Sequence, residues 1–250
     1  MKTLCDYHIH STFSDGKNTP EEMVEAAIAK GMKEIGFSDH SYTFFDESYC
    51  IKRENIAEYK REIARLKEKY GDKIKIYCGI EQDYYSAESV KDYDYAIGSV
   101  HYVKKDGRYF AVDSSAEDFE KNVVEFFDGD YYAFAEEYFN TVARFCERKD
   151  IIIIGHFDLV SKFNEKHGFF DENDKEYVSA WKAAADKLIA ANKTFEINTG
   201  TIARGYKTDC YPSRAIREYI KGKGGKFLLS SDSHSEKTLC FDFGQAEKSV

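Results

Sequence analysis

The sequence predicts an α/β fold built from seven strand–helix units. Short apolar runs that are typical of strands alternate with segments of helical periodicity along most of the chain. No internal repeat, low-complexity tract or linker interrupts this alternation, so we expect residues 1–250 to form one domain. Alternating strands and helices imply parallel pairing through right-handed crossovers. Seven units fit a closed or nearly closed (β/α) barrel of the TIM type, or a doubly wound open sheet, and periodicity alone does not separate the two.

The expected elements follow from local signals. The first helix has Thr19 as its N-cap, Glu22 three residues later to complete a capping box, and Gly31 after its end. Four successive isoleucines at 151–154 are typical of a strand buried on both faces, and Pro212 is expected in the first turn of a helix. We expect strands at residues 4–9, 34–37, 73–79, 95–100, 151–154, 194–197 and 226–229, and helices at 20–30, 53–70, 116–148 with a break near 128–130, 173–192 and 212–221.

The composition excludes several classes of protein. A net charge of −9 argues against a general electrostatic grip on long nucleic acid. No apolar run approaches the roughly 20 residues of a membrane helix, and no signal-peptide apolar region follows Met1. The six cysteines form no Cys-x-x-Cys pair, which favours reduced thiols over a zinc finger or a redox motif. We therefore expect a cytoplasmic protein that binds neither a membrane nor long nucleic acid.

Polar side chains follow the predicted strands at the point where each ends. Six of the seven histidines lie there, and only His167 falls in a polar loop that we expect at the surface. In a parallel barrel these strand ends share one rim, which is where such enzymes keep their active sites. Nine side chains of metal-ligating type are found at or next to these ends: His8, His10, Asp15, His40, Glu81, His101, His156, Asp232 and His234.

Nine candidate ligands exceed what one ion can use, because a single ion takes three to six protein groups. Imidazole and carboxylate suit Zn, Fe or Mn, so we expect two or three divalent metal ions that share a bridging carboxylate. Closely spaced ions activate a bridging water and clamp the oxygens of an in-line displacement, which favours phosphoester hydrolysis by a metal-bridging hydroxide. Deacylation or deamination is the nearest chemical alternative. Asp39 and Asp158 adjoin ligands and could orient imidazoles or cap helices.

The ordered set of short motifs resembles the polymerase and histidinol phosphatase (PHP) domain. The resemblance extends from residue 4 to about residue 244 and implies a distorted (β/α)₇ barrel with a trinuclear metal centre. By the family's pattern, one ion would be held by His8, His10, Glu81 and Asp232. A second would be held by Glu81, His101 and His156, and a third by Asp15, His40 and His234.

Residues 196–204, followed by Tyr211-Pro212-Ser213, resemble the histidinol-phosphatase branch of that family, and so does the aspartate at position 15. This likeness implies that Arg204 binds the substrate phosphate, for which a guanidinium is well suited, and that Glu81, Asp232 and Arg204 are the catalytic residues. The segment just before Arg204 departs from the expected pattern, and the chain ends sooner after its last motif than the family leads us to expect.

The resemblance implies a small phosphorylated substrate, and L-histidinol phosphate is the first candidate. Phosphoester hydrolysis of nucleotides, oligonucleotides or phosphotyrosine would use the same ligands. A silent metal-binding or regulatory module is the alternative outside catalysis, although every expected ligand is present.

Overall fold

The computed structural model describes residues 4–249 and contains a sheet of seven parallel strands. The strands lie in the order β1-β2-β3-β4-β7-β8-β9, and every pairing is parallel. Their bounds are β1 Cys5–Asp6, β2 Glu34–Phe37, β3 Lys75–Asp83, β4 Tyr95–Ser99, β7 Ile153–Ile154, β8 Thr194–Asn198 and β9 Lys226–Ser230. Each strand pairs with its neighbour in chain order, apart from the inserted β5 and β6, as the alternation in the sequence predicts.

The sheet nearly closes into a barrel, because the chain beyond β1 meets the chain beyond β9. Ile9 and Ser233 form a parallel bridge, in which the His10 N–H donates to the Ser233 carbonyl at 2.8 Å. The Ser233 N–H in turn donates to the His8 carbonyl at 3.1 Å. This bridge favours the barrel over the open sheet, and it joins the two ends of the chain at the strand ends.

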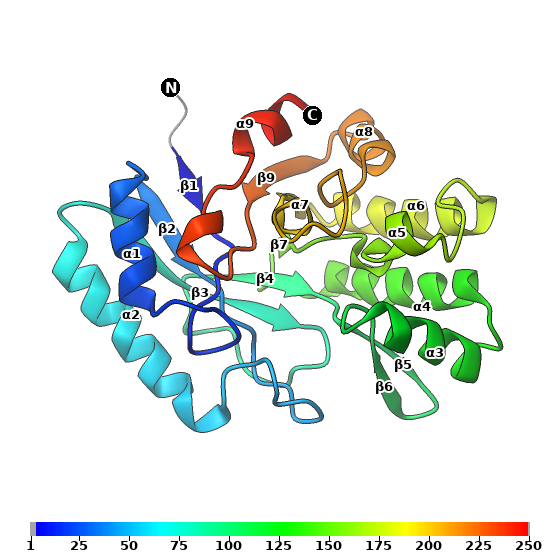
Figure 1. Cartoon of the computed structure of the whole chain (residues 1–250), viewed down its shortest axis with the longest axis horizontal. Coiled ribbons are helices and arrows are strands. Elements are labelled where there is room, and N and C mark those ends of the chain that lie inside the picture. Colours follow the sequence, from blue (N-terminus) through cyan, green and yellow to red (C-terminus); the bar gives the residue numbers. More distant parts are fainter. Residues whose placement is uncertain (1–3, 250) are drawn as a thin grey trace.

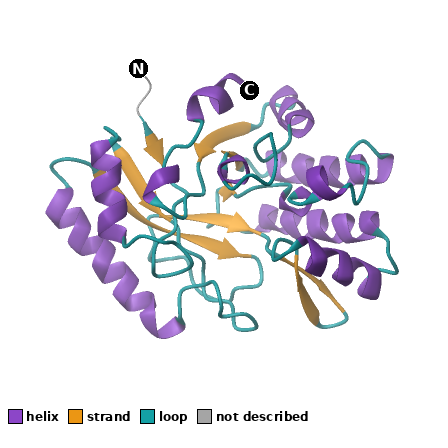
Figure 2. Ribbon diagram, in the orientation of Figure 1, coloured by secondary structure: helices purple, strands orange, loops and turns teal. Residues whose placement is uncertain are grey.

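Helices cover the outside of the barrel (Figures 1 and 2). The longer ones are α1 Pro20–Ala29, α2 Ile56–Tyr70, α3 Ala116–Phe126, α4 Tyr131–Ala143, α6 Lys175–Ala190 and α8 Arg214–Gly222. Short turns of helix are α5 Asn164–His167, α7 Gly200–Ala203 and α9 Phe243–Ala246, and 3₁₀ turns are η1 Arg53–Asn55, η2 Arg144–Glu147, η3 Leu159–Ser161, η4 Glu236–Thr238 and η5 Glu247–Ser249. None of the helices in residues 4–249 combines the length and the apolar character needed to cross a membrane.

Side-chain caps set several of these helix starts. The expected capping box is present, because the Thr19 side chain accepts from the Glu22 N–H while the Glu22 carboxylate accepts from the Thr19 N–H. Asp130 caps α4 by accepting from two backbone N–H groups of its first turn, which produces the break expected near residues 128–130. The sequence predicted the Thr19 cap, whereas near Asp130 it predicted the break and not the cap.

Local predictions are wrong in several places, beginning with the strand expected at residues 4–9, which covers only Cys5–Asp6. The strand expected at residues 151–154 shortens to Ile153–Ile154, and Ile152 is 57% exposed instead of buried. Pro212 lies before α8, since Ser213 is the N-cap residue and the helix begins at Arg214. The sequence analysis also missed an antiparallel hairpin, β5 Tyr102–Lys105 and β6 Arg108–Ala111, which turns at Asp106 and Gly107 with positive φ angles of 51° and 78°. An Asp-Gly pair between such runs is a hairpin signal.

Tyr95, at the start of β4, fills the space between two glycines of the neighbouring strands. Its hydroxyl donates to the Tyr7 carbonyl at 2.6 Å and lies 3.0 Å from the Phe37 carbonyl. A Cβ at Gly36 would lie 2.4 Å from the Tyr95 hydroxyl oxygen, and one at Gly79 would lie 2.3 Å from its ring. Only glycine therefore leaves room for this ring, which ties β4 to the chain after β1 and β2.

Candidate metal centre

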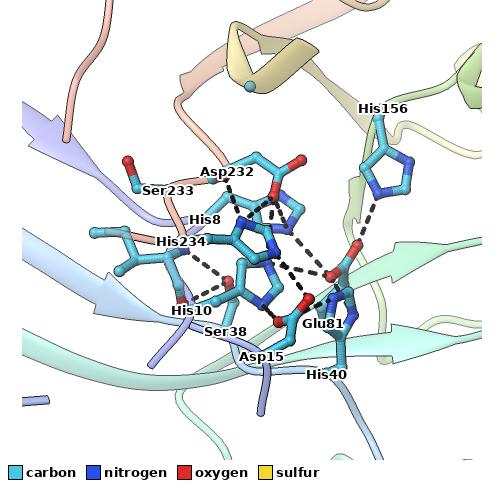
Figure 3. Close-up of polar contacts among 12 residues, drawn as sticks. His8, His10, Asp15, Ser38, His40, Glu81, His156, Asp232, Ser233 and His234 are labelled. Atoms are coloured by element: carbon cyan, nitrogen blue, oxygen red, sulfur yellow. Dashed lines mark hydrogen bonds and ion pairs between the residues drawn. The ribbon is translucent and has the colours of Figure 1, made fainter. Parts of the chain in front are cut away.

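The strand ends bring all nine predicted ligands together on one rim of the barrel, eight of them within or close after a strand and Asp15 in the loop that follows His10. Figure 3 labels all of them except His101. Their nitrogen and oxygen atoms form four overlapping groups in which the ligand atoms lie within 4.8 Å of one another. The groups are His10, Asp15, His40 and His234; His8, Glu81 and His156; His8, His10 and Asp232; and His40, Glu81 and His101.

Glu81, in β3, lies at the centre of the cluster. Its Oε1 is 2.8 Å from His156 Nε2 and 3.4 Å from His101 Nε2. Its Oε2 is 2.8 Å from His40 Nδ1 and 3.3 Å from His8 Nε2. A carboxylate whose two oxygens face different sets of imidazoles has the geometry of a bridging ligand.

Asp232 and Asp15 complete the cluster on either side of the His8–His10 pair. Asp232 Oδ1 lies 3.3 Å from His10 Nε2 and 3.8 Å from His8 Nε2. Asp15 Oδ2 lies 3.2 Å from His234 Nε2, and its Oδ1 lies 3.6 Å from His40 Nε2. His8, Glu81 and Asp232 therefore lie close together, although they are far apart in the sequence.

Several buried nitrogen and oxygen atoms of the cluster have no hydrogen-bond partner in the described part of the protein, and metal ions would provide one. Among the buried side-chain atoms without a hydrogen-bond partner in the described chain are His8 Nε2, both ring nitrogens of His10, and Glu81 Oε2. A buried polar atom left without a partner costs about 1–3 kcal/mol, so several at one place call for a ligand. The donors are nitrogen and oxygen only, a set that suits Zn, Fe or Mn.

Two carboxylates of the cluster stay ionised and one imidazole stays neutral. Burial alone would lower the pKa values of His8, His40 and His101, but the carboxylates outweigh it and raise them when no ion is bound. Burial alone would raise the pKa of the Glu81 carboxyl, but the neighbouring His8 and His40 outweigh it and hold that pKa well below its usual range. The same balance, with Arg204 as the main opposing charge, keeps the pKa of Asp232 low. Burial lowers the pKa of His10 to about 3, with help from its histidine neighbours, so this imidazole is neutral and free to ligate.

Two carboxylates that the sequence analysis did not single out orient ligand imidazoles. Glu196 Oε1, in β8, accepts from His8 Nδ1 at 2.7 Å, and both side chains are fully buried. Asp83 Oδ2, in β3, lies 3.3 Å from His101 Nδ1. Each fixes which ring nitrogen carries the hydrogen and directs the other nitrogen toward Glu81. The signal for Asp83 was its position two residues after Glu81 in β3, and the signal for Glu196 was its position near the end of β8, where the other strands carry ligands.

Asp39 and Asp158 do neither of the things expected of them. Asp39 accepts from the Ser11 N–H at 2.8 Å and from the Ser14 hydroxyl at 2.6 Å, and so holds the loop that carries Asp15. Asp158 accepts from the Ser213 N–H at 2.9 Å, just before α8. Neither contacts an imidazole through a hydrogen bond in the described chain, because Asp39 binds backbone and hydroxyl groups of the loop after His10 and Asp158 binds the backbone before α8.

Arg204 lies at the end of α7, where it lines a cavity of about 340 Å³ together with six of the nine candidate ligands. Its guanidinium donates to the Asp232 carbonyl and to Asp232 Oδ2, both at 2.9 Å. A Cβ at Gly200 would lie 2.8 Å from that guanidinium and 2.9 Å from Asp232 Cβ, so glycine allows α7 to approach this closely. The structure places Arg204 beside the candidate metal ligands.

Lys162 is a second cation of this cavity, and the sequence analysis missed it. Its Nζ donates to the Asp113 carbonyl at 2.7 Å and lies 3.2 Å from Asp113 Oδ2. The sequence offers no motif for it, because Lys162 follows a 3₁₀ turn and not a strand. His167, in contrast, is exposed and stacks on Phe169, away from the cluster, as expected of a surface residue.

Residues 6–200 match the sequence model of the PHP domain. The chain belongs to the PHP domain family. Within this family it is similar to the histidinol-phosphatase of Lactococcus lactis, with 31% identity over 95% of this chain and 86% of that protein. The PHP domain match ends at residue 200, whereas the likeness to this relative covers nearly the whole chain.

Two solved structures share the PHP fold of this chain. One comes from Listeria monocytogenes and carries a provisional histidinol-phosphatase assignment; it has a TM-score of 0.83 and 20% identity, over 96% of this chain and 99% of its own. The other is the L. lactis histidinol phosphate phosphatase in complex with zinc, L-histidinol and phosphate, with a TM-score of 0.69 and 23% identity, over 99% of this chain and 94% of its own. These likenesses confirm the predicted barrel.

Proposed function

We propose that this PHP protein is a metal-dependent phosphomonoesterase whose substrate is L-histidinol phosphate, which it hydrolyses to L-histidinol and phosphate. The observation that carries the proposal is the convergence of nine imidazoles and carboxylates on one barrel rim, beside a cavity that also holds two cationic side chains. The relatives named as histidinol phosphatases support both the reaction and the substrate.

The four overlapping groups suggest sites for two or three divalent ions, with Glu81 shared between neighbouring sites. We propose His8, His10 and Asp232 at one ion, His101 and His156 at another, and Asp15, His40 and His234 at a third. Bound ions would supply Lewis-acid polarisation of the phosphate oxygens and activation of water as a nucleophile at neutral pH.

The chain's own side chains would bind and orient the phosphate. The fixed charge of Arg204 and the ammonium of Lys162 would offset negative charge on the phosphoryl oxygens. Glu81 and Asp232, whose pKa values are held low, would stay ionised through the cycle and keep the centre assembled. Arg204 would also act through Asp232, since its guanidinium is bound to that carboxylate on the side of the cavity.

The test is a phosphate-release panel on purified protein with measured metal content. It compares L-histidinol phosphate with nucleoside monophosphates and aryl phosphates at equal concentrations. We expect kcat/KM to be highest for L-histidinol phosphate and to fall to background when metal is removed. Strong nucleotide turnover without L-histidinol-phosphate turnover would reject the substrate and keep the phosphatase, whereas full turnover in metal-free buffer would reject the metal-dependent reaction.

We also propose that the protein is a single domain and that it is located in the cytoplasm. One PHP-type barrel carries every residue invoked, and the six cysteines are free thiols, as suits a reducing compartment.

A further inference from the structure

The loop that follows β2 forms part of the cavity wall. After the ligand His40, this loop brings Asp46, Ser48 and Tyr49 to the cavity that holds the candidate metal ligands. The Tyr49 ring lies 4.9 Å from the His40 ring and 6.0 Å from the His101 ring, measured between centroids. A phosphate ester bound at the metal centre would therefore have this loop beside it, along with Tyr102 from the hairpin.

The charges of the cavity wall pair with one another, with one exception. Besides the candidate ligands, the lining contains four charged side chains, Asp46, Asp113, Lys162 and Arg204. Arg204 is bound to Asp232, and Lys162 is bound to Asp113. Asp46 has no ion pair with a lysine or arginine of the described chain, and the Lys52 ammonium pairs with Glu47 at 3.6 Å instead.

The Asp46 carboxylate is held in place by neutral donors. It accepts from the Ser48 N–H at 3.0 Å, from the Ser48 hydroxyl at 2.6 Å and from the Tyr102 hydroxyl at 2.7 Å. Burial alone would raise the pKa of Asp46, but the bonds from Ser48 and Tyr102, with a smaller contribution from the charge of Lys52, outweigh it and lower that pKa. Asp46 is thus a fixed carboxylate on the wall of the cavity, with no lysine or arginine of the described chain within ion-pair distance, although the charge of Lys52 acts on it from farther away.

We propose that Asp46 is a specificity-determining residue that binds a positively charged group, an ammonium or an imidazolium, on the leaving alcohol of the substrate. The proposal rests on the proposed function, because it takes the phosphate to lie at the metal centre and the alcohol to extend toward Asp46. Tyr49 and Tyr102 support it, since both residues line the same cavity and aromatic rings attract cations. The preferred substrate class is therefore a phosphomonoester of an amino alcohol, and not of a neutral or acidic alcohol.

The experiment compares esters with and without a cationic leaving group on the metal-loaded enzyme. L-Histidinol phosphate and O-phosphoethanolamine carry a cation, whereas phenyl phosphate does not. We expect D46N to lower kcat/KM for the two cationic esters by roughly 10- to 100-fold, as suits the loss of a charge-assisted hydrogen bond. The same variant should change kcat/KM for phenyl phosphate less than about threefold.

E47Q is the matched control, because Glu47 is the next residue, carries the same charge and does not line the cavity. It should leave the ratio between cationic and neutral esters unchanged. An equal loss on all three esters in D46N, or an equal change of the ratio in E47Q, would overturn the proposal. If D46N turns over no ester, calorimetry with L-histidinol on folded protein decides, because it requires no turnover: wild-type affinity in D46N rejects the proposal.

The two proposals fail differently. Absence of L-histidinol-phosphate turnover in the wild type rejects the proposed substrate, and O-phosphoethanolamine against phenyl phosphate then still tests Asp46. Normal L-histidinol-phosphate turnover with no selective loss in D46N rejects the role of Asp46 and leaves the proposed function intact.

Discussion

Glu196 Oε1 lies 2.7 Å from His8 Nδ1, and both side chains are fully buried. The second oxygen of the same carboxylate accepts from the His156 N–H and from the Asn198 side-chain amide, both at 3.1 Å. Glu196 therefore connects two candidate ligands, one just after β1 and one just after β7, that face different oxygens of Glu81. Because a carboxylate only accepts, His8 carries its hydrogen on Nδ1 and offers Nε2 to the centre.

E196Q should lower metal affinity by about 10- to 100-fold, the usual effect of losing such a partner. A glutamine has one accepting oxygen, so either His8 or the His156 N–H loses its acceptor. Metal content after dialysis against a graded series of free zinc measures the effect. E176Q, on the exposed face of α6, is the control and should retain wild-type metal content. Equal zinc affinity in E196Q and wild type would show that Glu196 does not position His8.

Removal of metal should lower the melting temperature. The orphaned atoms of His8, His10 and Glu81 gain partners only when ions bind, so the ions bind the folded state selectively. At a free ion concentration of 100 times Kd, binding adds about 2.7 kcal/mol to the free energy of unfolding. For a chain of this size, that corresponds to a rise in melting temperature on the order of 5–10 °C. Differential scanning calorimetry before and after chelation and dialysis measures the shift. An unchanged melting temperature, with metal shown to be absent, would contradict a metal centre.

R204Q should reduce kcat/KM by about 100-fold, the scale found for loss of one donor to a developing negative charge. The guanidinium lines the cavity and also binds Asp232. Its loss should therefore weaken phosphate binding and also loosen the position of Asp232 in the candidate metal centre. Inhibition by inorganic phosphate should weaken in parallel, which separates phosphate binding from a general loss of rate. R214Q is the control, because Arg214 pairs with Glu218 at the surface. An unchanged inhibition constant for phosphate in R204Q would remove Arg204 from the phosphate site.

G79A should destabilise the fold by about 1–3 kcal/mol through overpacking. The new methyl group would meet the Tyr95 ring at 2.3 Å, and the hydroxyl of that ring is held by its bond to the Tyr7 carbonyl, with the Phe37 carbonyl 3.0 Å away. Urea unfolding of both proteins gives the difference. G222A, at the end of α8, meets nothing within 4 Å and should be neutral. Equal stability of G79A and wild type would mean that Tyr95 moves freely.

Much of the fold was predictable because apolar periodicity and caps are local signals. Thr19 and Glu22 mark the start of α1, and the strand at residues 34–37 was located to the residue. The hairpin was missed although its Asp106-Gly107 turn is a local signal. The extra length of β3, which continues to Asp83, follows from pairing with β4, and that pairing is a tertiary contact.

The candidate ligands were predictable for a different reason. A parallel barrel places every strand end on one rim, so position in the sequence predicts position in space for His40 or His156. The carboxylates behind the ligands follow no such rule. Glu196 points to His8 while Asp39 turns to Ser11, and only the packing of neighbouring strands decides between these outcomes.

The bridge between Ile9 and Ser233 has a consequence for the timing of assembly. A ribosome releases His8 and His10 long before Asp232 and His234. Until β9 and the segment after it have left the ribosome, the nascent chain lacks two of the nine candidate ligands and has no closed barrel. Metal capture by the complete ligand set therefore has to follow the release of residues 232–234, and a chain truncated before residue 232 would lack the complete centre even if most of its barrel had formed.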